Sequence, residues 1–339
     1  MNQVLSAEAA MARAIECARL GLGKTFPNPI VGAVITSASG EFISEGFHQG
    51  ADHAEVVAIN AAKVIPAGAI IYVTLEPCNH QGKTPPCTQA IIAAGIKKVV
   101  YAVSDPNPIA AGGGEYLRTS GVEVEHGLLE SEAAFDNRAW LTKIAKGRPR
   151  INWKIASTMD GKVAAADGTS KWITSELART DVALLRSHAD AIVTTTATVK
   201  ADNPLLTSKG AGKNPVRIVM GSSEVASGSQ ILNADAETVV IKSRDLQDLI
   251  STSKARGFNQ LLIESGPTFG TALLKAGLID EVVLYQAPTF FGSGTPSISD
   301  LGIATISQRL DFEIADVEVI GADLRITLIK SANLEESGR

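Results

Sequence analysis

The stretch His53–Cys87 reads HAEVVAINAAKVIPAGAIIYVTLEPCNHQGKTPPC, and it decides the fold of the first half of the chain. It begins with an apolar, helix-forming run and continues into the branched run Ala69–Leu75. It ends with Cys78 and Cys87, each directly after a proline. A helix, then a strand, then a new helix start is the pattern of an α/β fold. We therefore expect the two cysteines and His53 to lie at the ends of such elements.

Three of these residues match the ligand set of a catalytic zinc. Such a zinc typically takes three protein ligands and leaves a fourth position for water. His53, Cys78 and Cys87 supply three ligands, and Glu55 is placed to handle protons instead of metal. The prolines before Cys87 predict a helix start there, where the helix dipole favours a thiolate. Zinc-dependent nucleobase deaminases use this arrangement.

Simpler interpretations of the same residues exist. A His-x-Glu triplet alone is a weak signal, and only its combination with two prolyl-cysteines is specific. A structural zinc site needs a fourth Cys or His, and His80 is the nearby candidate. Cys17 stands among alanines in a helical pattern, so we expect a small buried apolar residue there.

The composition limits the class of protein. A chain of 339 residues is long enough for two domains, and its 45% hydrophobic and 20% charged residues are typical of a globular protein. The net charge of −5 lacks the basic footprint of a nucleic-acid binder. The first residues predict no signal peptide, and no apolar run is long enough for a membrane helix. Three cysteines do not form a disulfide framework, so we expect a cytoplasmic protein. From the charge and the absence of a membrane helix, we expect no nucleic-acid or membrane partner.

Strands and helices alternate in both halves of the chain, which predicts an α/β fold with crossover connections. The short basic segment Lys146–Arg150 contains Gly and Pro and is expected to separate a domain at 1–146 from one at 150–339. Strands are expected at Ile30–Ile35, Ala69–Leu75, Lys97–Val103, Ile151–Ile155, Ala191–Thr195, Val216–Val219, Thr238–Ile241, Gln260–Ile263, Glu281–Tyr285, Asp311–Val319 and Leu324–Ile329. Helices are expected from Ser6 to near Gly21, and at His53–Val64, Thr88–Ala94, Ser131–Ala145, Ser175–Ser187 and Thr268–Ala276.

Longer segments carry a resemblance to a known family. TLEPCNHQGKTPPC at Thr74–Cys87, PNPIVGAVI at Pro27–Ile35, GFH at Gly46–His48 and DPNP at Asp105–Pro108 look like the bifunctional riboflavin-biosynthesis deaminase/reductase family. Cytidine and tRNA adenosine deaminases mostly show a shorter Cys-x-x-Cys. In the second half, STMDGKVA, SKWITS, LLRSHADAIVTTTATVKADNP and IESGPTFGTALL resemble the reductase part of the same family.

The resemblance implies a fold and an activity. It implies an N-terminal cytidine-deaminase-like three-layer domain and a C-terminal dihydrofolate-reductase-like α/β domain. The first would use zinc to deaminate 2,5-diamino-6-(5-phosphoribosylamino)pyrimidin-4(3H)-one by hydrolysis, with Glu55 as the proton shuttle. The second would use NADPH to reduce the ribosyl group to ribityl, giving 5-amino-6-(5-phosphoribitylamino)uracil. Members of the family are usually dimers or tetramers, so a homo-oligomer is expected.

The resemblance also implies binding residues, carried over position by position. The deaminase substrate would contact Asn28, His48, His80 and Lys83. NADPH would contact Ser157, Trp172, Thr198, Asp202, Ser222, Gly266, Pro267, Thr268, Phe269, Gly270, Thr271 and Ala272. The reductase substrate would contact Lys154, Ser170, Arg186, Leu206, Lys209 and Glu264.

Several of these residues also have ordinary structural explanations. Asn28 fits a turn between two prolines, and Lys83 fits a solvated loop. Trp172 fits core packing, and Arg186 fits a solvated helix face. The Glu264–Thr268 turn lacks the G-x-G-x-x-G fingerprint, so alone it fits a simple strand-to-helix connection, although its free N–H groups suit a pyrophosphate.

The second half departs from the family at two positions. Lys209 stands where an arginine is often found, and lysine keeps the charge but loses the bidentate fork. Gly221 stands where an aspartate is expected after the strand, which weakens the assignment of Ser222 to the cofactor. The loop between Thr207 and Pro215 is also short.

Three rival functions stay open on the sequence. The first is a nucleic-acid-editing deaminase with an accessory domain, although no basic, aromatic-rich stripe is present. The second is a deaminase fused to a ligand-binding module without catalytic activity. The third is a zinc-stabilised interaction protein.

Overall fold

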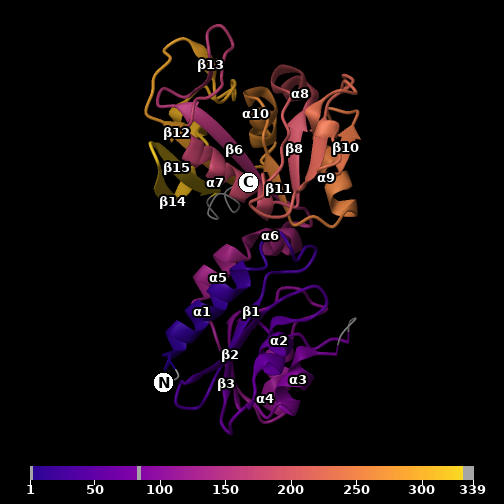
Figure 1. Ribbon diagram of the computed structural model, residues 1–339, viewed down its shortest axis with the longest axis vertical. Helices are drawn as coiled ribbons and strands as arrows, with labels where there is room; N and C mark the ends of the chain where they lie inside the picture. Colours follow the sequence, from indigo (N-terminus) through magenta and orange to yellow (C-terminus); the bar gives the residue numbers. More distant parts are fainter. Residues whose placement is uncertain (1–2, 82–84, 331–339) are drawn as a thin grey trace. The chain divides into compact units, whose positions relative to one another are not determined.

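The computed structural model describes residues 3–81 and 85–330 (Figure 1), so the predicted substrate residue Lys83 lies outside the described residues. The chain divides into two compact units, Met1–Gly147 and Arg148–Arg339, and the division falls inside the basic Lys146–Arg150 segment. Among the residues that the structure describes, none of the helices has the length and apolar character that a membrane span requires.

The first unit is built on a sheet with the strand order β2-β1-β3-β4-β5. Strand β1 is antiparallel to β2 and β3, whereas β3, β4 and β5 run parallel. The strands are β1 Gly32–Thr36, β2 Phe42–Phe47, β3 Ile70–Leu75, β4 Lys98–Val103 and β5 Glu123–His126. The helices are α1 Ala7–Arg19, α2 Ala54–Ala61, α3 Cys87–Ala93, α4 Gly113–Thr119, α5 Glu130–Asp136 and α6 Arg138–Lys146.

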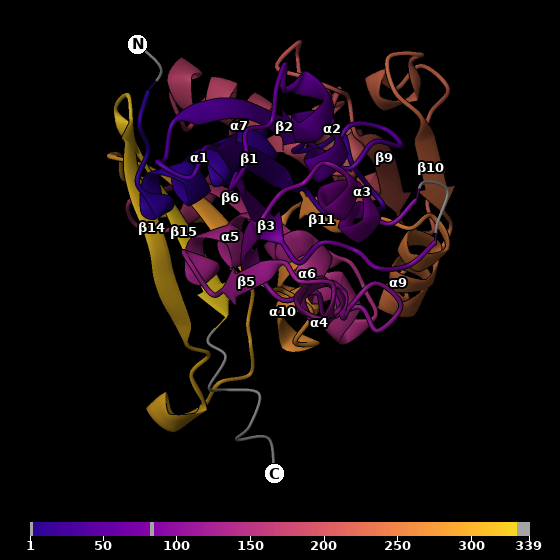
Figure 2. The ribbon, with the colours of Figure 1, turned by 90° about the horizontal axis from the view of Figure 1, so that it is seen from below.

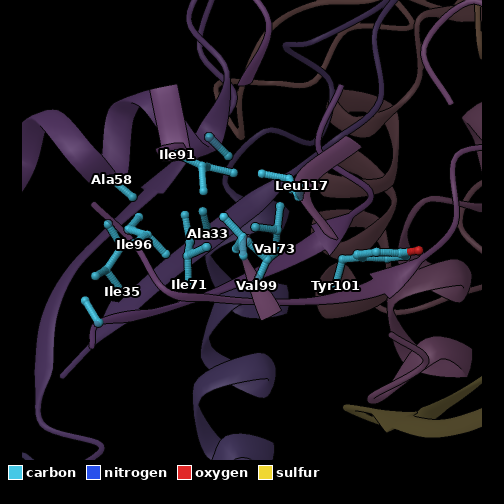
Figure 3. Packing of buried hydrophobic residues seen from close by; sticks show 13 residues of the cluster. Ala33, Ile35, Ala58, Ile71, Val73, Ile91, Ile96, Val99, Tyr101 and Leu117 are labelled. Carbon is cyan, nitrogen blue, oxygen red and sulfur yellow. The ribbon is translucent and has the colours of Figure 1, made fainter. Parts of the chain in front are cut away.

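Both faces of this sheet are covered by helices, because its central strands β1, β3 and β4 are mostly apolar and are buried at nearly every position. Successive side chains of a strand point to opposite faces. Ile71 and Val73 of β3 therefore pack with α2, α3 and α4 in one core cluster (Figure 3), and Tyr72 packs with α1, α5 and α6 in the other. The unit thus has three layers, with the sheet between two groups of helices, as predicted.

The helix ends follow local chemistry, and one prediction is wrong. The Ser6 hydroxyl caps α1 by accepting the N–H of Ala9 at 3.1 Å, as expected. The single helix predicted at Ser131–Ala145 is instead two helices, α5 and α6, separated at Asn137. The Asn137 side-chain oxygen accepts the N–H of Ile30 at 3.3 Å, and this bond ties the break to the segment before β1. Elements β2, α4 and β5 were not predicted.

The second unit has a larger sheet with the strand order β10-β9-β8-β11-β6-β12-β15-β14. The first six strands are parallel, and β15 is antiparallel to both β12 and β14. Strands β14 and β15 form the long yellow hairpin in Figure 2. The strands are β6 Arg150–Thr158, β8 Ala191–Thr195, β9 Val216–Met220, β10 Thr238–Ile241, β11 Gln260–Ile263, β12 Glu281–Ala287, β14 Phe312–Ile320 and β15 Asp323–Lys330.

Four helices of the described second unit and a small hairpin complete it. The helices are α7 Glu176–His188, α8 Thr196–Asp202, α9 Leu246–Ala255 and α10 Pro267–Lys275, and the hairpin pairs β7 Lys162–Ala165 with β13 Gly294–Pro296. Ser175 and Thr195 cap α7 and α8 through their hydroxyls. The elements α8, α9, β7 and β13 were not predicted.

The basic boundary segment has a structural task in the second unit. Arg148 makes a bidentate ion pair with Asp280 at 2.7 and 2.9 Å, and Arg150 pairs with Glu281 at 3.2 Å. Asp280 also accepts the N–H of Ile151 at 2.9 Å. These contacts fix the start of β6 beside the start of β12, so β6 occupies its central position in the sheet.

Candidate active sites

The first site lies where α2 and α3 begin. His53 is the N-cap residue of α2, and Cys87 is the first residue of α3, as the two prolines before it predicted. His53 Nδ1 lies 3.1 Å from Cys87 Sγ and 3.5 Å from Cys78 Sγ. The three donor atoms all lie within 4.8 Å of one another. Ligands of a tetrahedral zinc are separated by about 3.5 Å, so this nitrogen and these two sulfurs fit a zinc ion.

The pKa values of the Cys78 and Cys87 thiols favour the loss of a proton when a cation binds between them. The hydrogen bond with Cys87 lowers the pKa of the Cys78 thiol to about 4, and His53 acts in the same direction against the effect of burial. The backbone N–H of Cys87 also donates to Cys78 Sγ at 3.4 Å. The same pairing raises the pKa of the Cys87 thiol. Two thiolates at this separation would need a bound positive charge, which Zn²⁺ can supply.

Glu55 is buried beside these ligands. Glu55 is 3% exposed and lies in the first turn of α2. Burial raises the pKa of the Glu55 carboxyl to about 7, although a hydrogen bond with Cys87 opposes this rise. A carboxyl group that titrates near neutral pH can both take up and release a proton, which general acid–base chemistry requires.

Two of the predicted deaminase substrate residues meet near the ligands. The Asn28 amide nitrogen lies 3.2 Å from His48 Nε2, and the His48 ring lies edge-on to the His53 ring with centroids 5.4 Å apart. Burial lowers the pKa of His48, which favours the neutral form of its imidazole. The buried Nδ1 of His80 has no hydrogen-bond partner in the described part of the chain. Cys17 is buried in α1, as expected.

The second site lies at the carboxyl ends of parallel strands. Strands β8, β11 and β6 are adjacent and parallel, so the residues that follow them gather at one edge of the sheet. Ser157 is the second-last residue of β6, Thr198 lies after β8, and Gly266 lies after β11. The Gly266 N–H donates to the Thr198 hydroxyl at 3.4 Å, which joins two of the predicted cofactor segments.

Three predicted substrate residues form one buried ionic cluster. Arg186 donates to both carboxylate oxygens of Glu264 at 2.6 and 2.9 Å, and Lys154 Nζ lies 3.7 Å from the same carboxylate. Burial alone would raise the pKa of Glu264, but the charges of Arg186 and Lys154 lower it to about 2. Burial also lowers the pKa of Lys154. The Arg186 side chain is therefore largely engaged by protein groups, which excludes a solvated helix face.

The segment before α7 reaches the end of α8. The Lys171 ammonium donates to the Asp202 carbonyl at 3.0 Å, which brings the neighbours Ser170 and Trp172 close to α8. Trp172 is 67% exposed, so core packing is excluded, and the Arg179 guanidinium lies over its ring at 4.5 Å. An exposed aromatic ring at this edge is available to a ligand.

The residues Gly266–Ala272 divide into two groups. Gly266 is the N-cap of α10, and a Cβ there would meet no atom within 4 Å, which fits a ligand phosphate at this helix N-terminus. Gly270 and Thr271 face the interior instead. A side chain at Gly270 would lie 2.1 Å from the Trp153 ring, and the Thr271 hydroxyl accepts the N–H of Ser299 at 2.9 Å. The latter two residues therefore have clear packing roles.

The departures from the family have local explanations. Gly221 adopts φ of 139°, and a Cβ there would lie 2.3 Å from the Thr196 hydroxyl, so this backbone has no room for aspartate. Ser222 is exposed next to it. Leu206 is buried, whereas Lys209 is exposed, and both have positive φ angles of 50°.

Sequence reasoning missed Arg217, which organises the same region. Arg217 is buried in β9 and donates to the carbonyls of Leu205 and Asn233 at 3.3 and 2.7 Å. Arg186 donates to the Thr207 carbonyl at 3.2 Å. Two guanidinium groups thus hold the loop on either side of Leu206. The available signal was a charged residue within the otherwise apolar strand Val216–Met220.

Comparison with known proteins gives consistent matches for both units. Residues 149–326 match the family model described as the RibD C-terminal domain, and residues 5–103 match the cytidine and deoxycytidylate deaminase zinc-binding region. Riboflavin biosynthesis protein RibD of Mycobacterium tuberculosis (strain ATCC 25618 / H37Rv) is 42% identical and covers 97% of this chain and 99% of its own. The Escherichia coli (strain K12) protein of that name is 38% identical, over 94% of this chain and 98% of its own.

A solved structure resembles the whole chain. The diaminohydroxyphosphoribosylaminopyrimidine deaminase/5-amino-6-(5-phosphoribosylamino)uracil reductase of Thermotoga maritima superposes with a TM-score of 0.88 at 35% identity. The match covers 96% of this chain and 98% of that one. The predicted fold classes, a cytidine-deaminase-like unit followed by a dihydrofolate-reductase-like unit, are confirmed.

Replacement of either cysteine ligand should abolish zinc binding. We expect about one zinc ion per chain in the wild type and close to none in Cys78→Ala or Cys87→Ala, because each removes one of three ligands. The control Cys17→Ala changes a buried thiol outside the site and should keep its zinc. Elemental analysis of the dialysed proteins measures this. Full zinc content in both ligand variants would contradict the site.

The Arg186–Glu264 pair should give stability that depends on pH with a definite sign. Arg186→Met leaves the Glu264 carboxylate buried beside Lys154, and breaking such a pair costs about 3–5 kcal/mol at pH 7. The depressed pKa of Glu264 means that its contribution to wild-type stability is present above pH 4.5 and lost as the pH falls towards 2.

In Arg186→Met, protonation of Glu264 relieves the buried charge, so the difference from wild type should shrink between pH 7 and pH 4.5. Urea unfolding of both proteins at the two pH values measures it, with Arg186→Met/Glu264→Gln as the control that removes both charges. An equal difference at both pH values would refute the assignment of the buried charge.

Proposed function

The chain belongs to the RibD family of riboflavin-biosynthesis proteins, and from that premise we propose that residues 1–146 form its deaminase domain and 150–339 its reductase domain. The protein is a bifunctional deaminase and reductase that uses zinc and NADPH. The observation that carries the assignment of the deaminase activity is the His53, Cys78 and Cys87 donor set in the unit that matches the deaminase region.

We propose the substrates that the family implies. The Thermotoga maritima relative is named as a deaminase of a diaminohydroxyphosphoribosylaminopyrimidine and a reductase of 5-amino-6-(5-phosphoribosylamino)uracil. For this chain, the first reaction is hydrolytic deamination of 2,5-diamino-6-(5-phosphoribosylamino)pyrimidin-4(3H)-one. The second is reduction of the ribosyl group, giving 5-amino-6-(5-phosphoribitylamino)uracil. The product of the first unit is thus the substrate of the second.

In the deaminase unit, His53, Cys78 and Cys87 would hold Zn²⁺ through one nitrogen and two sulfurs. When bound, zinc supplies Lewis acidity that makes water nucleophilic near neutral pH. Glu55 takes a proton from the attacking water and delivers it to the amine nitrogen that leaves as ammonia. Its burial and its raised pKa suit both halves of this transfer.

The deaminase substrate would be held by residues that converge on the same ligands. The Asn28 amide beside His48 offers a donor and an acceptor to the polar edge of a pyrimidine ring. The buried Nδ1 of His80 is available for a further contact. Lys83 remains the candidate for the substrate phosphate.

In the reductase unit, the first turn of α10 fits the phosphates of NADPH. When bound, NADPH supplies the reducing equivalents. We propose that Ser157, Trp172, Thr198, Asp202, Ser222 and Gly266–Ala272 line the cofactor, with Gly270 and Thr271 acting through packing. Lys154 is the group that can give a proton to the ribosyl oxygen, because its lowered pKa makes proton release easier. Ser170, Leu206 and Lys209 would contact the substrate beside it.

Glu264 and Arg186 act on Lys154 in this proposal. The Glu264 carboxylate lies 3.7 Å from the Lys154 ammonium and fixes its position, and Arg186 keeps that carboxylate ionised. Because Arg186 binds both oxygens of Glu264 and the Thr207 carbonyl, only its N–H groups outside these three bonds could contact a substrate phosphate.

We also propose that the chain forms a homo-oligomer through the edge strand β14. Its Ile314, Val317 and Val319 side chains are 68%, 52% and 71% exposed. Exposed apolar residues in a row on an edge strand favour association with another chain. We propose that strand β14 binds a second copy of this chain, in line with the dimers and tetramers that the resemblance implies.

The location proposed for the enzyme is the cytoplasm. Cys17, Cys78 and Cys87 are all free thiols, and two of them must stay reduced to bind zinc. The substrates are small polar phosphates that a metabolic enzyme meets inside the cell. Fractionation of cells that express the protein should therefore recover it with cytosolic markers, and recovery with extracellular proteins would contradict this.

Two single variants should separate the activities. Glu55→Gln should slow ammonia release by 10²-fold or more while it retains zinc and oxidises NADPH normally with the deaminated substrate. Lys154→Met should slow NADPH oxidation, while its ammonia release stays normal. Each variant serves as the folding control of the other. Undiminished ammonia release by Glu55→Gln, or undiminished NADPH oxidation by Lys154→Met, would remove that residue from its proposed role.

A charge on β14 should dissociate the oligomer. Val317→Glu is expected to reduce the molar mass, measured by light scattering after gel filtration, towards that of one chain, because the carboxylate would be buried at the interface. Val240→Glu places the same charge on the opposite edge strand, β10, and should leave the mass unchanged. An unchanged mass for Val317→Glu would reject this surface.

A further inference from the structure

Glu76 is a buried carboxylate between β3 and the metal site, and no step proposed above uses it. It lies two residues before the ligand Cys78. One carboxylate oxygen accepts the N–H of Gly114 at 2.9 Å, and the other accepts the N–H of Asp105 at 3.1 Å. The Glu76 backbone N–H donates to Val103 at 2.8 Å, so the residue itself is fixed to the end of β4. A single side chain therefore fastens both ends of the segment Asp105–Gly114.

The middle of that segment covers the two thiols. Ala110 is buried and packs against Cys78 and Cys87 in one apolar cluster. Its carbonyl accepts the N–H of Asn79, the residue after Cys78, at 3.4 Å. Through Ala110, the segment thus places an apolar contact on the sulfur side of the site.

The end of the segment also fixes the turn that carries Cys78. A Cβ on Gly113 would lie 1.7 Å from the Pro77 carbonyl oxygen, which shows how closely the start of α4 abuts the peptide before Cys78. The position of Cys78 is therefore coupled to the segment through packing as well as through Glu76.

We propose that Glu76 is a positioning residue of the zinc site, which holds the Asp105–Gly114 segment against Cys78 and Cys87. By keeping Ala110 on the sulfurs, it limits the access of water and competing ligands to the metal–sulfur side and leaves the side of the attacking water open. Groups around the direct ligands control solvent access and ligand orientation, and their loss typically costs 10–100-fold in metal affinity. The inference rests on the proposed zinc site.

Glu76→Gln separates this role from simple filling of space. Both partners of the carboxylate are N–H donors, and a glutamine amide has one acceptor oxygen and an NH₂ group that cannot accept. The variant keeps the shape of the side chain but loses one of the two bonds. Glu115→Gln is the matched control, since Glu115 is an exposed carboxylate on α4 that pairs with Arg118 at 3.5 Å.

The test uses the full-length, zinc-loaded proteins. The measured quantities are the rate of zinc transfer to a chromogenic chelator and the absorption spectrum after replacement by Co²⁺. Glu76→Gln should release zinc about 10–100-fold faster than wild type and change the cobalt spectrum. Its NADPH oxidation in the second unit should be normal, and Glu115→Gln should match wild type throughout. Wild-type release and spectrum in Glu76→Gln would overturn the proposal.

A second variant covers the case in which Glu76→Gln does not fold. Ala110→Gly removes only the methyl group that covers the thiols and leaves both bonds of Glu76 in place. It should release zinc several-fold faster, whereas an unchanged rate would again overturn the proposal. Absence of zinc from the wild-type protein would be a different result, because it would refute the metal site itself.

Discussion

The sulfurs of Cys78 and Cys87 and the Nδ1 of His53 lie so close together that two thiolates there would repel each other unless a cation is bound. This electrostatic constraint governs the first unit. Strand β3 delivers Cys78, while α2 and α3, packed on the same face of the sheet, deliver His53 and Cys87 from their N-termini. The pKa values of the two thiols move in opposite directions without a metal, so a divalent ion resolves the conflict. Glu55 lies in the first turn of α2 beside these residues, and burial there raises the pKa of its carboxyl to about 7.

The second unit handles a buried charge in a different way. Glu264 follows a central parallel strand and stays ionised because Arg186 and Lys154 face it. The cluster lies at the edge where the carboxyl ends of β8, β11 and β6 meet, which is where α/β sheets commonly bind their ligands. Metal binding and a protein ion cluster are thus two solutions to the burial of charge. In each unit a group proposed to transfer protons lies beside the buried charge: Glu55 in the first unit and Lys154 in the second.

Much of this could be predicted from the sequence, and the failures have physical causes. The clustering of His53, Cys78 and Cys87 could be predicted because their types and spacing are rare, and the central strands because they are mostly apolar. The break at Asn137 could not, since it depends on a hydrogen bond to Ile30, more than a hundred residues away. The partners of Arg186 were equally hidden, because a helix pattern does not reveal which carboxylate lies opposite. The packing contacts of Gly270 and Thr271, which match a cofactor motif, were hidden as well, because a sequence pattern does not show which way a side chain faces.

The central claim is that one nitrogen and two sulfurs of this chain bind zinc and leave room for a further light ligand. X-ray absorption at the zinc K-edge of the purified full-length protein tests it directly. We expect two sulfur neighbours at about 2.3 Å, and nitrogen or oxygen neighbours at about 2.0–2.1 Å that complete four-coordination. A shell of four sulfurs, or a shell without sulfur, would contradict the account.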